Sequence, residues 1–154
     1  MLKPGDPAPP FTLPSDGGGT IALKDLRGKK VVLYFYPKDD TSGCTVEACE
    51  FRDSWAQVQA SGAVVLGVSP DGLASHQKFK QKHQLPFPLL ADEDHAVAER
   101  YGAWGEKSMY GRKYRGILRT TFIIDEHGRI AKVFPKVKPR GHAAEVLAGL
   151  QAVS

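Results

Sequence analysis

One buried strand that runs directly into a cysteine-containing helix constrains this chain most. Residues 30–36 are mainly β-branched and aromatic, which is typical of a central strand covered on both faces. The stretch that follows, 37–49, indicates a crossing from this strand into a helix, and it contains both cysteines of the chain, Cys44 and Cys49. A functional site is therefore expected first in this stretch.

The other segments supply the elements of a mixed α/β fold. Prolines over 4–14 predict an extended N-terminal segment anchored by Phe11 and Leu13, and a turn signal at 16–19 predicts a small hairpin. The stretch 104–116 shows no clear period and is predicted to be a long connection. The remaining pattern predicts one helical turn at 23–28, helices over 44–60, 73–83, 96–101 and 141–153, and strands over 63–69, 86–90, 116–124 and 129–134.

The order of these elements predicts a thioredoxin-like α/β fold, with a mixed central sheet flanked by helices and an N-terminal extension. A strand, helix, strand succession implies a parallel pair joined by a right-handed crossover, and the last two strands form an antiparallel hairpin. The length of 154 residues fits a single domain over 1–154.

Composition sets the expected compartment and excludes several classes of partner. Two cysteines are too few for a disulfide scaffold, and residues 1–7 contain no apolar signal region, so the expected location is cytoplasmic. No segment has the apolar length of a membrane span. The net charge is +4, but cations alternate with acids except over 107–119, so neither nucleic acid nor membrane is an expected partner.

Cys44 is placed where a thiolate is favoured. In the first turn of a helix, unpaired backbone N–H groups and the helix dipole attract negative charge, and the thiolate is the reactive form of cysteine. Pro37 fixes the exit from the strand, Thr41 or Ser42 can cap the helix, and Gly43 permits close approach of the backbone. The alternative is that Cys44 is a small buried hydrophobe.

The motif around Cys44 resembles that of a known family. The pattern Pro-x-x-x-Thr-x-x-Cys, formed by Pro37, Thr41 and Cys44, resembles the peroxidatic motif of the peroxiredoxins. The fuller run over 35–53 is similar to the bacterioferritin-comigratory, or Q-type, branch, as are the stretches 8–11, 110–112 and 119–125. Ser42 departs from that branch, which usually has proline there.

The resemblance implies a role for each residue of the motif. Cys44 would be the peroxidatic cysteine, whose thiolate attacks a peroxide oxygen and becomes a sulfenic acid. Thr41 would offer its hydroxyl to the peroxide, and the backbone N–H groups of Gly43 and Cys44 would hold the oxygens in line. Pro37 would shield the thiolate from water, and Arg119 would stabilise the thiolate and the developing charge.

Two charged residues can also be judged from their positions. Arg119 lies near the start of a strand, where a parallel neighbour would bring it beside the helix N-terminus, although an arginine at a strand end is usually a solvated charge. Glu47 follows Cys44 by one helical turn and could orient Arg119 through an ion pair. The alternative for Glu47 is an acid placed favourably in a first helical turn.

Cys49 raises a geometric question. Positions i and i+5 of an α-helix differ by ~7.5 Å in rise and ~140° in direction, so their sulfurs cannot meet across an intact helix. The resemblance implies that Cys49 is the resolving cysteine of an atypical two-cysteine peroxiredoxin. Formation of a Cys44–Cys49 disulfide would then unwind residues 42–52. The alternative is an inert Cys49 on an inner stripe with Val46, Trp55, Val58 and Gln59.

The function implied is a thiol-dependent peroxidase that reduces hydrogen peroxide and organic hydroperoxides without a cofactor. A thioredoxin-like dithiol would be the reductant, and the branch is often monomeric, which implies a monomer here. Two alternatives are a thiol redox sensor without significant turnover and a structural protein with incidental thiols. No metal is expected, because the histidines lack metal-ligand spacing and sit in surface-like contexts: His76, His83, His95, His127 and His142.

Overall fold

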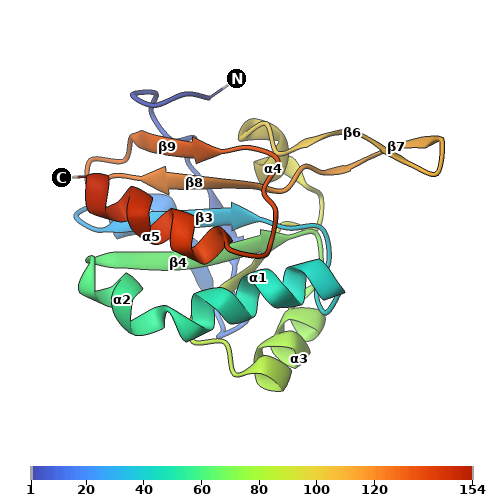
Figure 1. The fold of residues 1–154 in the computed structure, drawn as a ribbon, viewed down its shortest axis with the longest axis horizontal. Coiled ribbons are helices and arrows are strands. Elements are labelled where there is room, and N and C mark those ends of the chain that lie inside the picture. The colour runs from blue at the N-terminus through green and yellow to red at the C-terminus, as the bar shows by residue number, and fades with distance from the viewer. Residues whose placement is uncertain (1, 154) are drawn as a thin grey trace.

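A mixed five-stranded sheet forms the centre of the molecule (Figure 1). The computed structural model describes residues 2–153, apart from the side chain of Met109. The strand order is β5-β4-β3-β8-β9. The strands are β3 (Lys30–Phe35), β4 (Ala63–Ser69), β5 (Leu89–Ala91), β8 (Thr120–Ile124) and β9 (Ile130–Phe134).

Strand directions agree with the expected crossover. β3 and β4 are parallel, as are β4 and β5, whereas β8 runs antiparallel to both β3 and β9. The register places Phe35, the last residue of β3, opposite Thr120, the first residue of β8. The end of β3 and the start of β8 therefore meet at one edge of the sheet.

Helices cover both faces of the sheet, and β3 contributes alternate side chains to each. Val32 and Tyr34 of β3, and Tyr36 directly after it, pack in one cluster. The same cluster contains residues of α1 (Ser42–Asp53), α2 (Trp55–Ala60), α3 (Leu73–His83) and α5 (His142–Ala152). Val31 and Phe35 face the opposite cluster, which includes α4 (Ala96–Arg100) and the N-terminal segment. The predicted thioredoxin-like arrangement is confirmed.

The N-terminal extension also matches its prediction. Phe11 and Leu13 are buried, and β1 (Thr12–Pro14) pairs antiparallel with β2 (Thr20–Ala22) before the short helical turn η1 (Leu23–Leu26). None of the helices within residues 2–153 has the length and apolar character needed to cross a membrane.

The helix predicted over 44–60 is in fact two helices. It is interrupted at Ser54, whose φ of −97° and ψ of 8° are not helical, and α1 already begins at Ser42. The buried residues of α1 are consequently Cys44, Glu47, Ala48 and Phe51. Most of the residues predicted to face the core are therefore not the buried ones. Val46, Cys49 and Trp55 are only partly buried and Gln59 is exposed, so Val58 is the one predicted residue that is fully buried.

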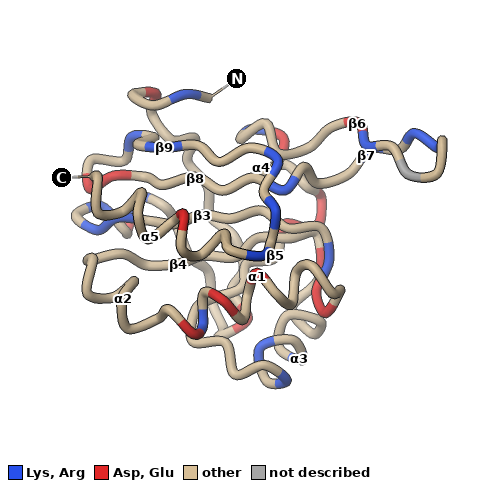
Figure 2. The backbone as a smooth tube through the Cα atoms, viewed as in Figure 1, with Lys and Arg blue, Asp and Glu red and all other residues tan. Residues whose placement is uncertain are grey.

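The stretch predicted as a connection forms an antiparallel hairpin, β6 (Trp104–Met109) with β7 (Arg112–Ile117). Its turn residues Tyr110 and Gly111 have φ of 53° and 79°, a pair of left-handed conformations that suits a two-residue hairpin turn. The hairpin projects from the body and carries several cations (Figures 1 and 2). Most side chains of β7 are exposed, so its sequence lacks the alternation of apolar and polar residues that predicts a strand. The strand predicted over 116–124 is divided between the end of β7 and β8.

Candidate active site

Cys44 lies buried in the first turn of α1, at the carboxyl end of the central strand. Only 1% of its surface is exposed, and its thiol is free. Thr41 is the N-cap residue with an extended backbone, so Cys44 stands among the first N–H groups of the helix. The predicted position of Cys44 at a helix N-terminus is therefore confirmed.

Arg119 reaches Cys44 from the sheet. Its Nη2 lies 3.3 Å from the Cys44 sulfur, and this contact joins residues that are 75 positions apart. The neighbour that brings Arg119 here is antiparallel, not parallel as predicted: β8 starts where β3 ends, so the residue just before β8 lies beside the loop that leaves β3. Arg119 is thus part of the site and not a solvated charge.

Glu47 holds the other end of the same guanidinium. Nη1 of Arg119 donates to Oε1 of Glu47 at 2.8 Å, and the carboxylate side chain has no exposed surface. Burial raises the pKa of Glu47 to about 7, although the charge and hydrogen bond of Arg119 act to lower it. Among the described residues, Oε2 of Glu47 has no hydrogen-bond partner. Burial acts to lower the pKa of Arg119, but Glu47 and Cys44 raise it above its ordinary value.

The loop residues of the motif lie between the end of β3 and the first turn of α1. Thr41 is exposed, and its Oγ1 donates to the backbone carbonyl of Lys38 at 2.9 Å, so it does not cap the helix with its side chain. Gly43 is tightly enclosed: a Cβ atom there would lie 3.3 Å from Nη2 of Arg119 and 3.3 Å from Cγ of Pro139. Pro37 is half-buried at the exit from β3.

Cys49 lies on the same helix but not in the same environment. It is half-buried and free, and α1 is continuous between the two cysteines. An intact helix separates positions i and i+5 by ~7.5 Å of rise, so the two thiols are held apart.

Two further residues adjoin the site without having been predicted. Pro139, in the segment before α5, contacts the position of Gly43. Lys107 of β6 has its pKa lowered by burial and by the charge of Arg119, while Cys44 raises it. Lys107 carried a signal in the basic stretch 107–119, whereas nothing in the sequence marked Pro139.

The histidine expectation needs correction, because His76 and His142 are buried. Asp39, Asp71 and His76 place ligand atoms within 4.8 Å of one another, the one such group found within the described part of the chain. Each of the three is already engaged in hydrogen bonds within the protein, among them His76 to Asp39 at 2.6 Å and Ser69 to Asp71 at 2.8 Å. The group is an internal polar network.

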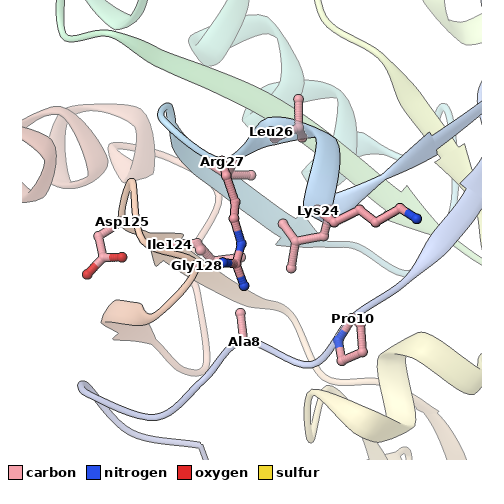
Figure 3. A pocket seen from close by; sticks show the side chains of 10 residues that line it. Ala8, Pro10, Lys24, Leu26, Arg27, Ile124, Asp125 and Gly128 are labelled. Carbon is pink, nitrogen blue, oxygen red and sulfur yellow. The ribbon is translucent and has the colours of Figure 1, made fainter.

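A hollow of about 70 Å³ lies at the opposite end of β3 (Figure 3). Val31, Ile124 and Arg27 contribute to its lining, and the register pairs Val31 with Ile124 far from the Phe35–Thr120 end. None of Cys44, Glu47 and Arg119 lines it, so it is separate from the thiol site.

Comparison with known sequences gives consistent matches along the chain. The model of the AhpC/TSA family matches residues 4–133. A putative peroxiredoxin bcp of Coxiella burnetii is 58% identical over 149 residues, which cover 97% of this chain and 99% of that protein. Peroxiredoxin Bcp of Bacillus subtilis is 50% identical over 153 residues, with 99% and 98% covered.

Solved structures agree with the sequence comparison. A cysteine-to-serine mutant of PrxQ from Xylella fastidiosa matches with a TM-score of 0.93 and 37% identity, covering 99% of this chain and 97% of that one. The bacterioferritin comigratory protein of Xanthomonas campestris, studied for alkyl peroxide reduction, matches with a TM-score of 0.88 and 39% identity, covering 92% and 90%. Sequence, fold and the placement of Cys44 together lead to one assignment: this chain belongs to the AhpC/TSA family and, within it, to the Bcp, or Q-type, peroxiredoxins.

Proposed function

We propose that Cys44 is the peroxidatic cysteine of this protein and that Cys49 resolves its oxidised form. As a Bcp peroxiredoxin the chain is a thiol peroxidase acting on peroxides. The observation that carries the proposed roles is the 3.3 Å contact between Nη2 of Arg119 and the buried sulfur of Cys44 at a helix N-terminus. A cation beside the sulfur and the position of the cysteine at a helix N-terminus both favour its thiolate.

The first step transfers one oxygen atom. The Cys44 thiolate attacks the nearer oxygen of the O–O bond, which breaks; the sulfur becomes a sulfenic acid, and the departing oxygen takes up a proton as water or an alcohol. Arg119 would stabilise the charge that moves onto the departing oxygen, and N–H groups of Gly43 and Cys44 would align the peroxide. Thr41 would hydrogen-bond the peroxide, and Pro37 would limit access of water.

The second step requires part of α1 to unwind. Attack of the Cys49 thiol on the sulfenic sulfur forms the disulfide and releases water, and it cannot occur while five helical positions separate the cysteines. Unwinding would break the ion pair between Glu47 and Arg119 and the bonds from the Gly141 N–H to the Glu50 carboxylate, 2.9 and 3.1 Å long. Phe51 is completely buried, so exposing its side chain would add roughly 2 kcal/mol to the free-energy cost of unwinding. Unwinding is therefore expected to stop short of Phe51.

The third step regenerates both thiols. A dithiol of the thioredoxin type would attack the exposed disulfide and leave as a disulfide itself, so two electrons pass from the dithiol to the peroxide in each cycle. We infer that residues 1–154 act as a single domain without a cofactor, as a monomer. The low cysteine content supports a cytoplasmic, reducing compartment.

Turnover separates this function from a redox sensor. With excess hydrogen peroxide and a thioredoxin system, the protein is expected to consume many equivalents of peroxide per chain, and Cys44→Ser to consume none. A sensor would stop after about one equivalent. Unchanged peroxide consumption by Cys44→Ser would instead support the structural alternative with incidental thiols.

A further inference from the structure

The loop that leads into α1 is tied to α3 by a buried network centred on Asp39. The Asp39 carboxylate accepts hydrogen bonds from the hydroxyls of Tyr36 at 2.6 Å and Ser75 at 2.8 Å, and it lies 2.6 Å from Nδ1 of His76. The backbone N–H of Asp39 donates to the Asp71 carboxylate at 2.7 Å. Four groups from three segments therefore converge on one residue of the loop.

Both ring nitrogens of His76 face oxygen atoms that can accept a hydrogen bond. Nε2 lies 2.9 Å from the backbone carbonyl oxygen of Leu90, which can only accept a hydrogen bond. Nδ1 faces the Asp39 carboxylate, which already accepts from two hydroxyls. Burial acts to lower the pKa of His76, but the hydrogen bond and charge of Asp39 raise it above its ordinary value. Asp39 and His76 thus form a buried, hydrogen-bonded pair, with side chains 3% and 0% exposed.

This pair stands at the start of the segment that has to unwind. Asp40, the next residue, has a left-handed φ of 61° and binds Lys82 of α3 at 2.8 Å. At the other end of the segment, Nη1 of Arg52 donates to the carbonyl of His83, the last residue of α3, at 2.8 Å. Residues 41–51 therefore lie between two attachments to the same helix.

We propose that Asp39 and His76 are positioning residues for the peroxide reaction, fixing the segment ahead of Cys44 on α3 while α1 is intact and while it unwinds. The second half of this proposal rests on the Cys44–Cys49 disulfide of the proposed function. An exposed ion pair such as Asp40 with Lys82 contributes little by itself, whereas removing one partner of a buried pair leaves the other polar group buried without its hydrogen bond. The buried pair is therefore the effective anchor.

In the reduced protein the anchor sets the geometry of the reacting groups. Thr41 and Gly43 follow Asp39 by only two and four positions, so a loosened loop moves the groups that would align the peroxide. Displacement by about 1 Å can cost on the order of 100-fold in rate. We expect His76→Gln to slow the oxidation of Cys44 by hydrogen peroxide about tenfold or more in a single-turnover measurement.

Asp16 offers a matched control. It is also a buried carboxylate paired with α3, through Lys80 at 2.8 Å, and it also binds β5, through the Leu89 N–H at 3.0 Å, but it holds the turn near residue 16. Asp16→Asn is expected to lower stability while keeping the oxidation rate within about twofold of the parent. Equal rate losses in Asp16→Asn and His76→Gln, or a folded His76→Gln within about twofold of the parent, would overturn the positioning role.

Ser75→Ala keeps the test open should His76→Gln not fold. It removes one donor to Asp39 and leaves the contact with His76, so a loss of roughly two- to fivefold in the oxidation rate is expected. Reduction of the preformed disulfide by dithiothreitol should be unchanged in Ser75→Ala, because that step does not use the aligned peroxide site. No rate loss in Ser75→Ala would count against the role.

The oxidised state supplies an independent measurement. After peroxide treatment, amide hydrogen exchange should accelerate within residues 42–50, while the Asp39 amide, bonded to Asp71, stays protected. Loss of protection at Asp39 together with residues 42–50 would overturn the anchor. If exchange accelerates nowhere, the disulfide cycle has failed, and the oxidation rates of His76→Gln and Asp16→Asn still decide the positioning role.

Discussion

Arg119 places Nη2 3.3 Å from the sulfur of Cys44, although the two residues are 75 positions apart in the chain. The same guanidinium binds Glu47 at 2.8 Å through Nη1. One side chain just before β8 therefore links the reactive sulfur to a buried carboxylate one turn along α1. This link ties the chemistry of Cys44 to the integrity of the helix.

Replacing Arg119 by lysine should slow the reaction with peroxide. A lysine ammonium cannot bridge the sulfur and the carboxylate in the forked geometry of a guanidinium. We expect Arg119→Lys to lower the second-order rate constant for oxidation of Cys44 by about 100-fold, in line with the loss of one directed donor at a site of developing charge.

The control for this variant is Arg115→Lys, which changes an exposed arginine of β7. Stopped-flow oxidation with hydrogen peroxide measures both rate constants. Arg115→Lys should match the parent, and a similar result for Arg119→Lys would contradict a role for the guanidinium.

Glu47 should make stability depend on pH. Its folded pKa, about 7, exceeds the ordinary value of 4.5 because of burial. A raised folded pKa means that the stabilising contribution is complete below the unfolded pKa and is lost as pH rises toward 7. Glu47→Gln mimics the protonated form and does not titrate. Between pH 4.5 and pH 8 the free energy of unfolding of the parent should therefore fall by about 3 kcal/mol relative to that of Glu47→Gln.

Urea unfolding at several pH values measures this difference. Glu126→Gln, which removes an exposed carboxylate in the turn between β8 and β9, controls for the loss of one negative charge. The opposite result, a parent that gains stability over Glu47→Gln as pH rises, would contradict the prediction. It would show that Arg119 lowers the pKa of Glu47 by more than burial raises it.

Gly43→Ala should separate folding from reactivity. Alanine favours a helix over glycine by about 1 kcal/mol, so stability should be kept or raised. The new methyl group would press on Arg119 and Pro139, each 3.3 Å away, and we expect oxidation of Cys44 to slow about tenfold.

Thr45→Ala is the matched substitution in the same turn, because it also increases helix propensity but adds no atom near Arg119. The two variants should therefore have similar thermal stability, and only Gly43→Ala should show slower oxidation of Cys44. Unchanged oxidation in Gly43→Ala would mean that the enclosure around Gly43 does not matter for the reaction.

The sequence predicted the centre of the site because its signals are local. The strand over 30–36, the polar loop and Cys44 follow one another, and Glu47 lies one turn farther on. Arg119 required the family motif, since its sequence position alone also fits a solvated charge. The pairing of β8 with β3 was predicted to be parallel and is antiparallel. The residues around Arg119 do not indicate which strand lies beside them or in which direction it runs.

Two features were not predicted from the sequence: one depends on a contact between residues far apart in the chain, and the other lacks a buried face. His76 is buried because Asp39, 37 positions away, pairs with it, and no local pattern marks such a pair. The β6–β7 hairpin has mostly exposed side chains in β7, so no alternation identifies it, although its turn at Tyr110 and Gly111 was a usable signal.

The mass of the intact protein after one equivalent of hydrogen peroxide tests the central claim most directly, namely that Cys49 resolves oxidised Cys44 within one chain. The parent should lose two hydrogens as the disulfide forms, and Cys49→Ser should gain one oxygen as the sulfenic acid persists. A gain of oxygen in both proteins would contradict the claim and leave Cys49 without a part in the reaction.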